Sequence, residues 1–264
     1  MTDKSYDIDL QALADFIGKC RSIFLDLFDR AKKVDEVQFA IALGPEMRGA
    51  QDVGWNTAIE ATHTLEDYHR LLEIAPPDSS MRVRVGLSLY CHLAEASGFY
   101  EVPKNMMVIA SGGSYSLNPF SSLNRYHAAG ELISPNATKV LKDLLGHAEQ
   151  LGLEGIKNII LEAFDFDIRN GYAHADYVIW DDGLRLPKRN GGTPKVIPFL
   201  ELGLKVNKAI ILFTSLQNCV AESMRSYAVP RRTEGRLNSH DSVKPALISY
   251  SDEKGLSIQV GFGV

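Results

Sequence analysis

The sequence predicts a mainly α-helical protein, a helical bundle that carries two short β-hairpins. Apolar residues recur three or four positions apart over several long stretches, which is typical of amphipathic helices. Two later segments alternate apolar and polar residues around turn-forming residues, which is typical of hairpins. We therefore expect a helical domain over residues 1–228, followed by a linker and C-terminal hairpin over residues 229–264 that pack on the same domain.

The first half of the chain is divided by its proline and glycine residues. Residues 8–33 and 58–74 each carry a long apolar stripe and are predicted helices, whereas the glycine-containing residues 38–55 predict a loop with at most one short element. A further helix is predicted over residues 79–97, because two serines supply its cap and a glycine follows its end. Residues 99–125 are rich in turn formers and are expected to be irregular.

The second half holds three more predicted helices. Residues 134–149 begin with a serine cap and a proline at the first helical position. A helix that starts near Ile156 is expected to end at Gly171, because glycine commonly closes a helix. Residues 206–227 form another strong amphipathic stripe.

Both hairpins are predicted from turn residues between β-prone runs. Asp-Asp-Gly separates Tyr177–Trp180 from Leu184–Leu186, and an Asp-Gly pair in this context is a strong hairpin signal. Residues 244–264 alternate around an Asp-Glu-Lys-Gly turn and predict the closing hairpin. The polar residues 231–241 before it are expected to be irregular.

Composition places the chain among ordinary soluble globular proteins. It has 264 residues, of which 45% are hydrophobic and 23% charged, and the formal net charge is −5. It has no apolar run of eighteen residues and its first residues do not resemble a signal peptide, so we expect a cytoplasmic protein without a membrane span. The negative charge argues against non-specific nucleic-acid binding but not against a small basic site. Cys20, Cys91 and Cys219 lack the spacing of a disulfide framework or a zinc site.

Residues 164–186 contain the densest group of reactive side chains, between the predicted helix end and the first hairpin. Arg169 offers a planar set of donors that suits phosphate oxygens. His174 has an ordinary pKa of about 6.5, which allows proton transfer near neutral pH. The two residue types together suit a reaction at a phosphodiester, and this chemistry requires no metal or cofactor.

The pattern Arg-Asn-x-x-x-His formed by Arg169 to His174 resembles the signature of the HEPN superfamily, in which an Arg precedes a His by four to six residues and a polar residue follows the Arg. The helix before the motif and the hairpin after it strengthen the resemblance. It implies a HEPN-like helical bundle, and a toxin or antiviral effector that acts as a metal-independent endoribonuclease.

The resemblance also implies roles for individual residues. His174 would act as general acid or base, and Arg169 would bind the phosphate. Asn170 would orient the phosphate or hold the imidazole, Tyr172 would stack on a base, and Glu95 would be a supporting polar residue. RNA is the implied substrate. The implied partners are a second copy, with the motif at the homodimer interface, and an antitoxin.

Two other interpretations of the motif remain open at the level of sequence. Arg169 would simply cap its helix and pair with Asp165 or Asp167, while His174 bonds a loop carbonyl. Alternatively, the chain would keep a HEPN-like fold without catalysis and serve as an RNA-binding, nucleotide-binding or protein-interaction scaffold.

A metal-dependent hydrolase is a more distant alternative. It would use His92, Glu95 and His174 as ligands, although a His-x-x-Glu pair with one remote histidine supplies few ligands at a loose spacing.

Overall fold

The computed structural model describes residues 10–44, 57–76, 79–128, 130–188, 191–238 and 240–261. It is mainly helical, with small antiparallel sheets. The helices are α1 (Leu10–Val34), α2 (Glu36–Leu43), α3 (Thr57–Ile74), α4 (Ser80–Glu95), α5 (Ser97–Ala110), the 3-10 helix η3 (Ser121–Leu123), α6 (Ala137–Gln150), α7 (Glu154–Ala163), α8 (Phe166–Ala173) and α9 (Phe199–Arg225). The strands are β1 (Arg125–Tyr126), β2 (Leu132–Ile133), β3 (Val178–Trp180), β4 (Gly183–Leu186), β5 (Lys195–Ile197), β6 (Arg231–Gly235), β7 (Lys244–Ser251) and β8 (Gly255–Val260).

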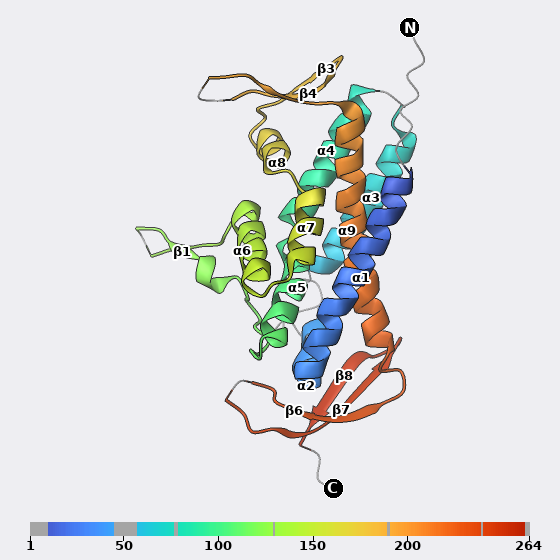
Figure 1. The fold of residues 1–264 in the computed structure, drawn as a ribbon, viewed down its shortest axis with the longest axis vertical. Coiled ribbons are helices and arrows are strands. Elements are labelled where there is room, and N and C mark those ends of the chain that lie inside the picture. Colours follow the sequence, from blue (N-terminus) through green and yellow to red (C-terminus); the bar gives the residue numbers. More distant parts are fainter. Residues whose placement is uncertain are drawn as a thin grey trace.

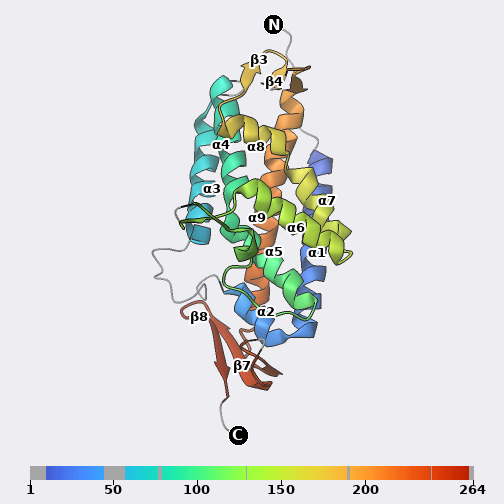
Figure 2. The same cartoon turned by 90° about the vertical axis from the view of Figure 1, so that its left-hand side faces the viewer.

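Helix α9 is the central element of the bundle. Its 27 residues extend over about 40 Å at the usual rise per residue. It packs against α1, α4 and α7 and contacts a small sheet near each of its ends (Figure 1). The view turned by 90° shows α6 and α7 on one side of this bundle, with α8 next to α4 (Figure 2).

The two three-stranded sheets lie at opposite ends of the molecule (Figure 1). In the first, β4 lies between β3 and β5, and Trp180 pairs with Gly183 across the Asp-Asp turn. In the second, β7 lies between β6 and β8, and Ser251 pairs with Gly255 across the closing turn. Both hairpins predicted from the sequence are therefore confirmed.

One large hydrophobic cluster joins the helices to strands of both sheets. Leu184 of β4 and Ile248 of β7 are both fully buried in it. The face that α9 turns to the core recurs every three or four residues and consists of Leu202, Val206, Ala209, Leu212, Phe213, Ser215, Leu216 and Cys219. Each large apolar side chain buried in this way stabilises the fold by about 1.5 to 3 kcal/mol.

Most of the predicted helices are confirmed. Those expected over residues 8–33, 58–74 and 79–97 correspond to α1, α3 and α4, within the described residues. Ser79 caps α4 as predicted, since its hydroxyl accepts a hydrogen bond from the Arg82 N–H at 3.1 Å.

The short element allowed within the predicted loop over residues 38–55 is helix α2, which spans Glu36–Leu43 and begins before that range; residues 45–56 lie outside the described residues. Every residue of α2 is buried, so the segment has no polar face and its sequence shows no helical period. Asp35 caps the helix by accepting hydrogen bonds from the Val37 and Gln38 N–H groups, each at 3.0 Å.

The irregular segment predicted over residues 99–125 is also wrong in part, because helix α5 continues to Ala110. Pro103 lies inside α5, where it supplies no N–H group and is usually read as a helix breaker. Burial of the neighbouring Met106 and Met107 in the core compensates for this cost, which only the tertiary structure reveals.

Two other local predictions need correction. Helix α6 is capped by Asn136, whose side chain accepts from the Lys139 N–H at 3.1 Å, so Pro135 precedes the helix instead of occupying its first position. Residues 231–235 form strand β6, although residues 231–241 were expected to be irregular. The buried Gln38 side chain helps to fix this segment through a 2.9 Å hydrogen bond to the Leu237 carbonyl.

Candidate functional site

The motif lies on its own short helix, which corrects the prediction of one helix from Ile156 to Gly171. Helix α7 ends at Ala163 and α8 begins after Asp165. The Tyr90 hydroxyl of α4 bridges this break, because it donates to the Ala163 carbonyl at 3.1 Å and accepts from the Asp165 N–H at 2.5 Å. Burial raises the pKa of the Tyr90 phenol far above its usual range, so it stays protonated and can donate.

Asp165 both caps α8 and connects it to the neighbouring sheet. Its carboxylate accepts from the Asp167 N–H at 2.8 Å and from the Ile168 N–H at 3.4 Å. Lys195 of β5 donates to Asp165 at 2.7 Å and to Asp167 at 3.0 Å. Burial alone would raise the pKa of the Asp165 carboxyl, but these hydrogen bonds and the Lys195 charge hold it below its ordinary value.

Gly171 lies inside α8 and does not close the helix. A Cβ atom at this position would lie 2.6 Å from Leu186 Cδ2 on β4 and 3.3 Å from the Asp176 carbonyl oxygen. The absence of a side chain therefore allows α8 to approach the sheet closely.

The C-terminal end of α8 contains the only described non-glycine residue with a positive φ angle, Ala175 at 54°. The Ala175 N–H donates to the Tyr172 carbonyl at 3.0 Å, and the Asp176 N–H donates to the Gly171 carbonyl at 2.8 Å. This is the Schellman arrangement, in which glycine is usual at the left-handed position. Alanine there costs about 1 to 2 kcal/mol of conformational energy.

Arg169 on α8 contacts Glu95, the last residue of α4. One carboxylate oxygen, Oε1, accepts from Arg169 Nε at 2.5 Å and also from Nη2. Arg169 Nη1 donates to the Asn170 side-chain oxygen at 2.9 Å. The Arg169 side chain is 14% exposed and that of Glu95 is 44% exposed. The guanidinium is thus held in position from two sides while part of it still reaches the surface.

These contacts leave part of the guanidinium available. It has five N–H donors, of which Glu95 uses two and Asn170 uses one. The two remaining protons, one on Nη1 and one on Nη2, have no hydrogen-bond partner among the described residues. Free guanidinium donors of this kind suit the oxygens of a phosphate group.

His174 is the C-terminal cap of α8 and its side chain is exposed. Its backbone N–H donates to the Asn170 carbonyl at 3.1 Å. Within the part of the chain that is described, no hydrogen bond joins its imidazole to Arg169 or to another side chain. Five helical positions separate the two motif residues, which corresponds to a rotation of about 140° around the helix axis. Their convergence on one phosphate therefore stays a prediction.

Tyr172 contacts other parts of the protein through its ring and its hydroxyl. Its ring stacks on Tyr177 with the centroids 5.7 Å apart and an interplanar angle of 25°. Its hydroxyl shares a hydrogen bond with Ser88 of α4. One face of the ring is therefore covered by Tyr177, and a base would have to stack on the other.

Sequence reasoning did not identify the side chains that hold the motif helix in place. Lys195, Tyr90 and Ser88 contact α8 or its cap from positions far away in the sequence. No local pattern could have found these three residues, because each contact depends on how distant elements pack.

The alternative in which Arg169 pairs with Asp165 or Asp167 is wrong. Asp165 and Asp167 bond Lys195, whereas Arg169 bonds Glu95. The metal-hydrolase alternative also lacks its site, because the described residues contain no group of three His, Cys, Asp or Glu side chains that could hold a metal ion. His92 instead lies near Tyr68, with ring centroids 6.3 Å apart.

Comparisons with protein-family models, curated proteins and solved structures found no match for this chain. None of the described helices has the length and apolar character needed to cross a membrane.

The three cysteines are free and buried, and burial raises the pKa of the Cys91 thiol, next to α8, to about 12.

Proposed function

We propose that the protein is a metal-independent endoribonuclease of HEPN type, a toxin or antiviral effector whose active site contains Arg169, Asn170 and His174. The observation that carries this proposal is the position of Arg169. Its guanidinium is oriented by Glu95 and Asn170 and keeps two unpartnered N–H donors among the described residues. An exposed histidine follows at the end of the same helix.

In the proposed reaction the 2′-hydroxyl of RNA attacks the adjacent phosphorus atom. The bond from phosphorus to the 5′-oxygen breaks, and the products carry a 2′,3′-cyclic phosphate and a 5′-hydroxyl. Arg169 would stabilise the charge that develops on the phosphate oxygens. His174 would transfer a proton to or from one of the two reacting oxygens.

We further propose a homodimer with the motif at its interface. One imidazole cannot easily serve both the attacking and the leaving oxygen, so a second copy would supply the other proton-transfer group. The rotation of about 140° between Arg169 and His174 on α8 supports this arrangement. It would let the two motif residues of one copy contact different parts of a shared RNA strand. An antitoxin would bind the same surface and block it.

The test is an RNA cleavage assay in the presence of EDTA, followed by analysis of the product ends. We expect products with a cyclic phosphate at one end and a 5′-hydroxyl at the other. A matched oligonucleotide with a single 2′-deoxy sugar before the scissile phosphate should resist cleavage at that bond, because it lacks the attacking oxygen. Cleavage of the 2′-deoxy position, or loss of activity on chelation, would contradict the proposed reaction.

A non-catalytic scaffold is the second candidate, and one observation favours it. The carboxylate of Glu95 contacts Arg169 and offsets its positive charge. Such a site would bind RNA, a nucleotide or a protein without releasing a product. Saturable RNA binding with intact RNA recovered after long incubation would favour the scaffold over the nuclease.

A further inference from the structure

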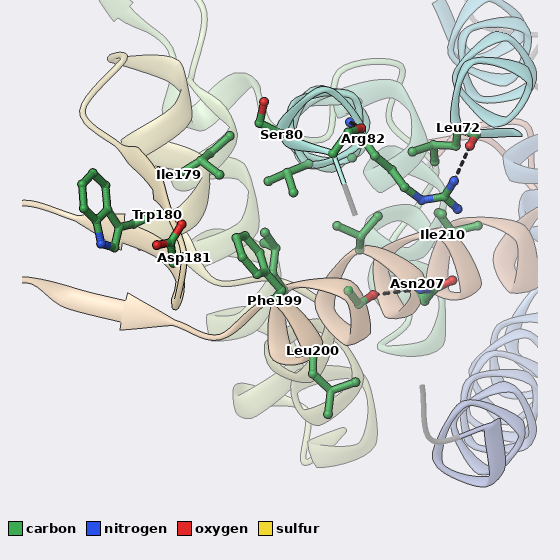
Figure 3. A pocket seen from close by; sticks show the side chains of 16 residues that line it. Leu72, Ser80, Arg82, Ile179, Trp180, Asp181, Phe199, Leu200, Asn207 and Ile210 are labelled. Atoms are coloured by element: carbon green, nitrogen blue, oxygen red, sulfur yellow. Dashed lines mark hydrogen bonds between the residues drawn. The ribbon is translucent and has the colours of Figure 1, made fainter. Parts of the chain in front are cut away.

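A second candidate site is a pocket of about 650 Å³ between α4, α9 and strand β3, and the residues that line it do not include Arg169 or His174. Its walls are mainly apolar and include Ile179, Phe199 and Ile210. Figure 3 shows Trp180 and Asp181 at one end of the pocket, Leu72 and Arg82 at the other, and Phe199 between them. Pockets of this volume and character hold small organic ligands in other proteins.

Two helical glycines keep the pocket open. Gly86 of α4 and Gly203 of α9 both line it. A Cβ at Gly86 would meet only a Val206 methyl at 3.8 Å, and a Cβ at Gly203 would meet nothing within 4 Å. Packing therefore does not require glycine at either position, although glycine inside a helix costs about 1 kcal/mol relative to alanine. What the missing side chains provide is space in the pocket.

The charged group at one end of the pocket is Arg82. Its Nη1 donates to the Leu72 carbonyl at 2.6 Å and to the Ala75 carbonyl at 3.4 Å, which fixes the guanidinium at the C-terminal end of α3. No carboxylate pairs with Arg82 among the described residues. Its remaining donors are thus suited to an anionic group at this end of the mainly apolar pocket, whereas the Asp181 carboxylate lies at the other end (Figure 3).

We propose that this pocket binds a small organic anion with an apolar body, whose acidic group contacts Arg82 and whose aliphatic or aromatic part lies along Val83, Phe199 and Val206. Apolar burial would supply most of the affinity and the ion pair would set the orientation. This inference uses neither Arg169 nor His174, so it stands or fails independently of the nuclease.

The test measures the binding of four probes to the full chain. Decanoate and 1-naphthaleneacetate carry a negative charge on an aliphatic and an aromatic body, respectively. Decan-1-ol is neutral, and decylammonium is positively charged. Calorimetry gives the Kd, and quenching of Trp180 fluorescence locates the ligand. Trp55→Phe leaves Trp180 as the sole tryptophan, since the sequence has two. We expect at least one anion to bind with one-to-one stoichiometry and more tightly than decanol or decylammonium.

Two glycine substitutions provide a matched pair. Gly203→Leu places a side chain in the pocket and should abolish anion binding. Gly18→Leu adds the same side chain to α1, where a Cβ also meets nothing within 4 Å, and should leave the Kd unchanged. Arg82→Gln should weaken decanoate about tenfold while leaving decanol unaffected, because only the anion uses the guanidinium. If Gly203→Leu does not fold, Gly203→Ala should still weaken binding several-fold.

The proposal is overturned if neither anion shows saturable binding below about 1 mM, or if the Gly203 variants bind as tightly as the Gly18 variant. It is also overturned if wild-type protein binds no probe while Gly203→Leu changes the oligomeric state. The pocket would then belong to a contact between two copies of the chain.

Discussion

Two carboxylates in different parts of the bundle contact cations in different ways. The side chain of Glu36, next to the C-terminal sheet, is 9% exposed, and it accepts from Tyr227 at 3.1 Å and from Arg231 Nε at 3.0 Å. The side chain of Glu95, the last residue of α4, is 44% exposed and contacts Arg169. Burial raises the pKa of the Tyr227 phenol, so its hydroxyl stays protonated and donates to Glu36.

The difference distinguishes a structural cluster from a candidate site. Around Glu36 a buried phenol depends on the carboxylate, so the cluster stabilises the join between α2 and the C-terminal sheet. Around Glu95 the contacts orient a guanidinium that keeps donors free among the described residues, on a helix whose C-terminal cap is an exposed histidine. The same residue types thus stabilise the fold around Glu36 and, in the proposed function, contribute to catalysis around Glu95.

The largest effect in this comparison is expected at Arg169 itself. Arg169→Lys should lower the RNA cleavage rate by roughly 100-fold, because an ammonium group cannot offer the fixed planar donors of a guanidinium. Arg21→Lys is the matched control, since Arg21 also pairs with a glutamate, Glu222, at 2.7 Å. It should leave cleavage unchanged. Equal RNA cleavage rates for Arg169→Lys and Arg21→Lys would show that Arg169 is not part of the active site.

Exchange of Glu36 or Glu95 for alanine tests directly how much each carboxylate stabilises the fold. Glu36→Ala should lower the free energy of unfolding by about 2 to 3 kcal/mol, because the buried Tyr227 hydroxyl loses its partner. Glu95→Ala should cost at most about 1 kcal/mol, since the pair is partly exposed. Urea denaturation measures both changes.

The activity of the same variants should show the reverse order. Glu95→Ala should reduce cleavage by roughly tenfold or more, because Arg169 loses the group that positions it. Glu95→Gln keeps an acceptor oxygen and should recover most of this rate, whereas Glu36→Ala should cleave normally at temperatures where it is folded. A merely structural role for Glu95 would show equal rates for Glu95→Ala and the wild type.

The glycines Gly235 and Gly171 also pack closely against their neighbours. A Cβ at Gly235 would lie 2.6 Å from the Cβ of buried Val37, which cannot move without its backbone, so Gly235→Ala should cost about 2 to 3 kcal/mol. At Gly171 the close atom is the tip of Leu186, and alanine improves helix propensity by up to about 1 kcal/mol. We expect a net loss of about 1 kcal/mol or less at Gly171. Equal losses in thermal or urea denaturation would show that the two contacts are equally rigid.

The smallest effect is expected at Ala175, the left-handed residue after α8. Ala175→Gly should raise the free energy of unfolding by up to about 1 kcal/mol, because glycine adopts a positive φ without strain. The gain is less than the full strain, since glycine also adds freedom to the unfolded chain. A decrease in stability would show that the alanine methyl group makes a contact that outweighs the strain.

Most features set by local sequence were predicted correctly, although the cap of α6 was not, and several features set by distant contacts were missed. Each correctly predicted pattern lies within one segment and specifies one type of secondary structure. Examples are the apolar stripes of α1 and α9 and the turn at Asp181 and Asp182. The helical type and the start of the short element α2 were not predicted, because burial on all sides removes its period. The break before α8 was missed because it depends on the Tyr90 hydroxyl, more than seventy residues earlier.

The candidate site divides in the same way. The sequence indicated Arg169, Asn170 and His174 as a motif, and the family resemblance implied Glu95 as a supporting residue. The spatial relation between the motif's own residues could not be predicted. It depends on α8 being a separate short helix, which places the arginine inside it and the histidine at its cap.

The proposed nuclease depends on the exposed imidazole of His174 at the end of α8. The most direct measurement is the single-turnover cleavage rate of one RNA in EDTA, compared for His174→Ala and for His69→Ala, an exposed histidine on α3. We predict a decrease of about 10²- to 10⁴-fold for His174→Ala, with unchanged thermal unfolding, and no decrease for His69→Ala. Equal cleavage by both variants would contradict the proposed nuclease.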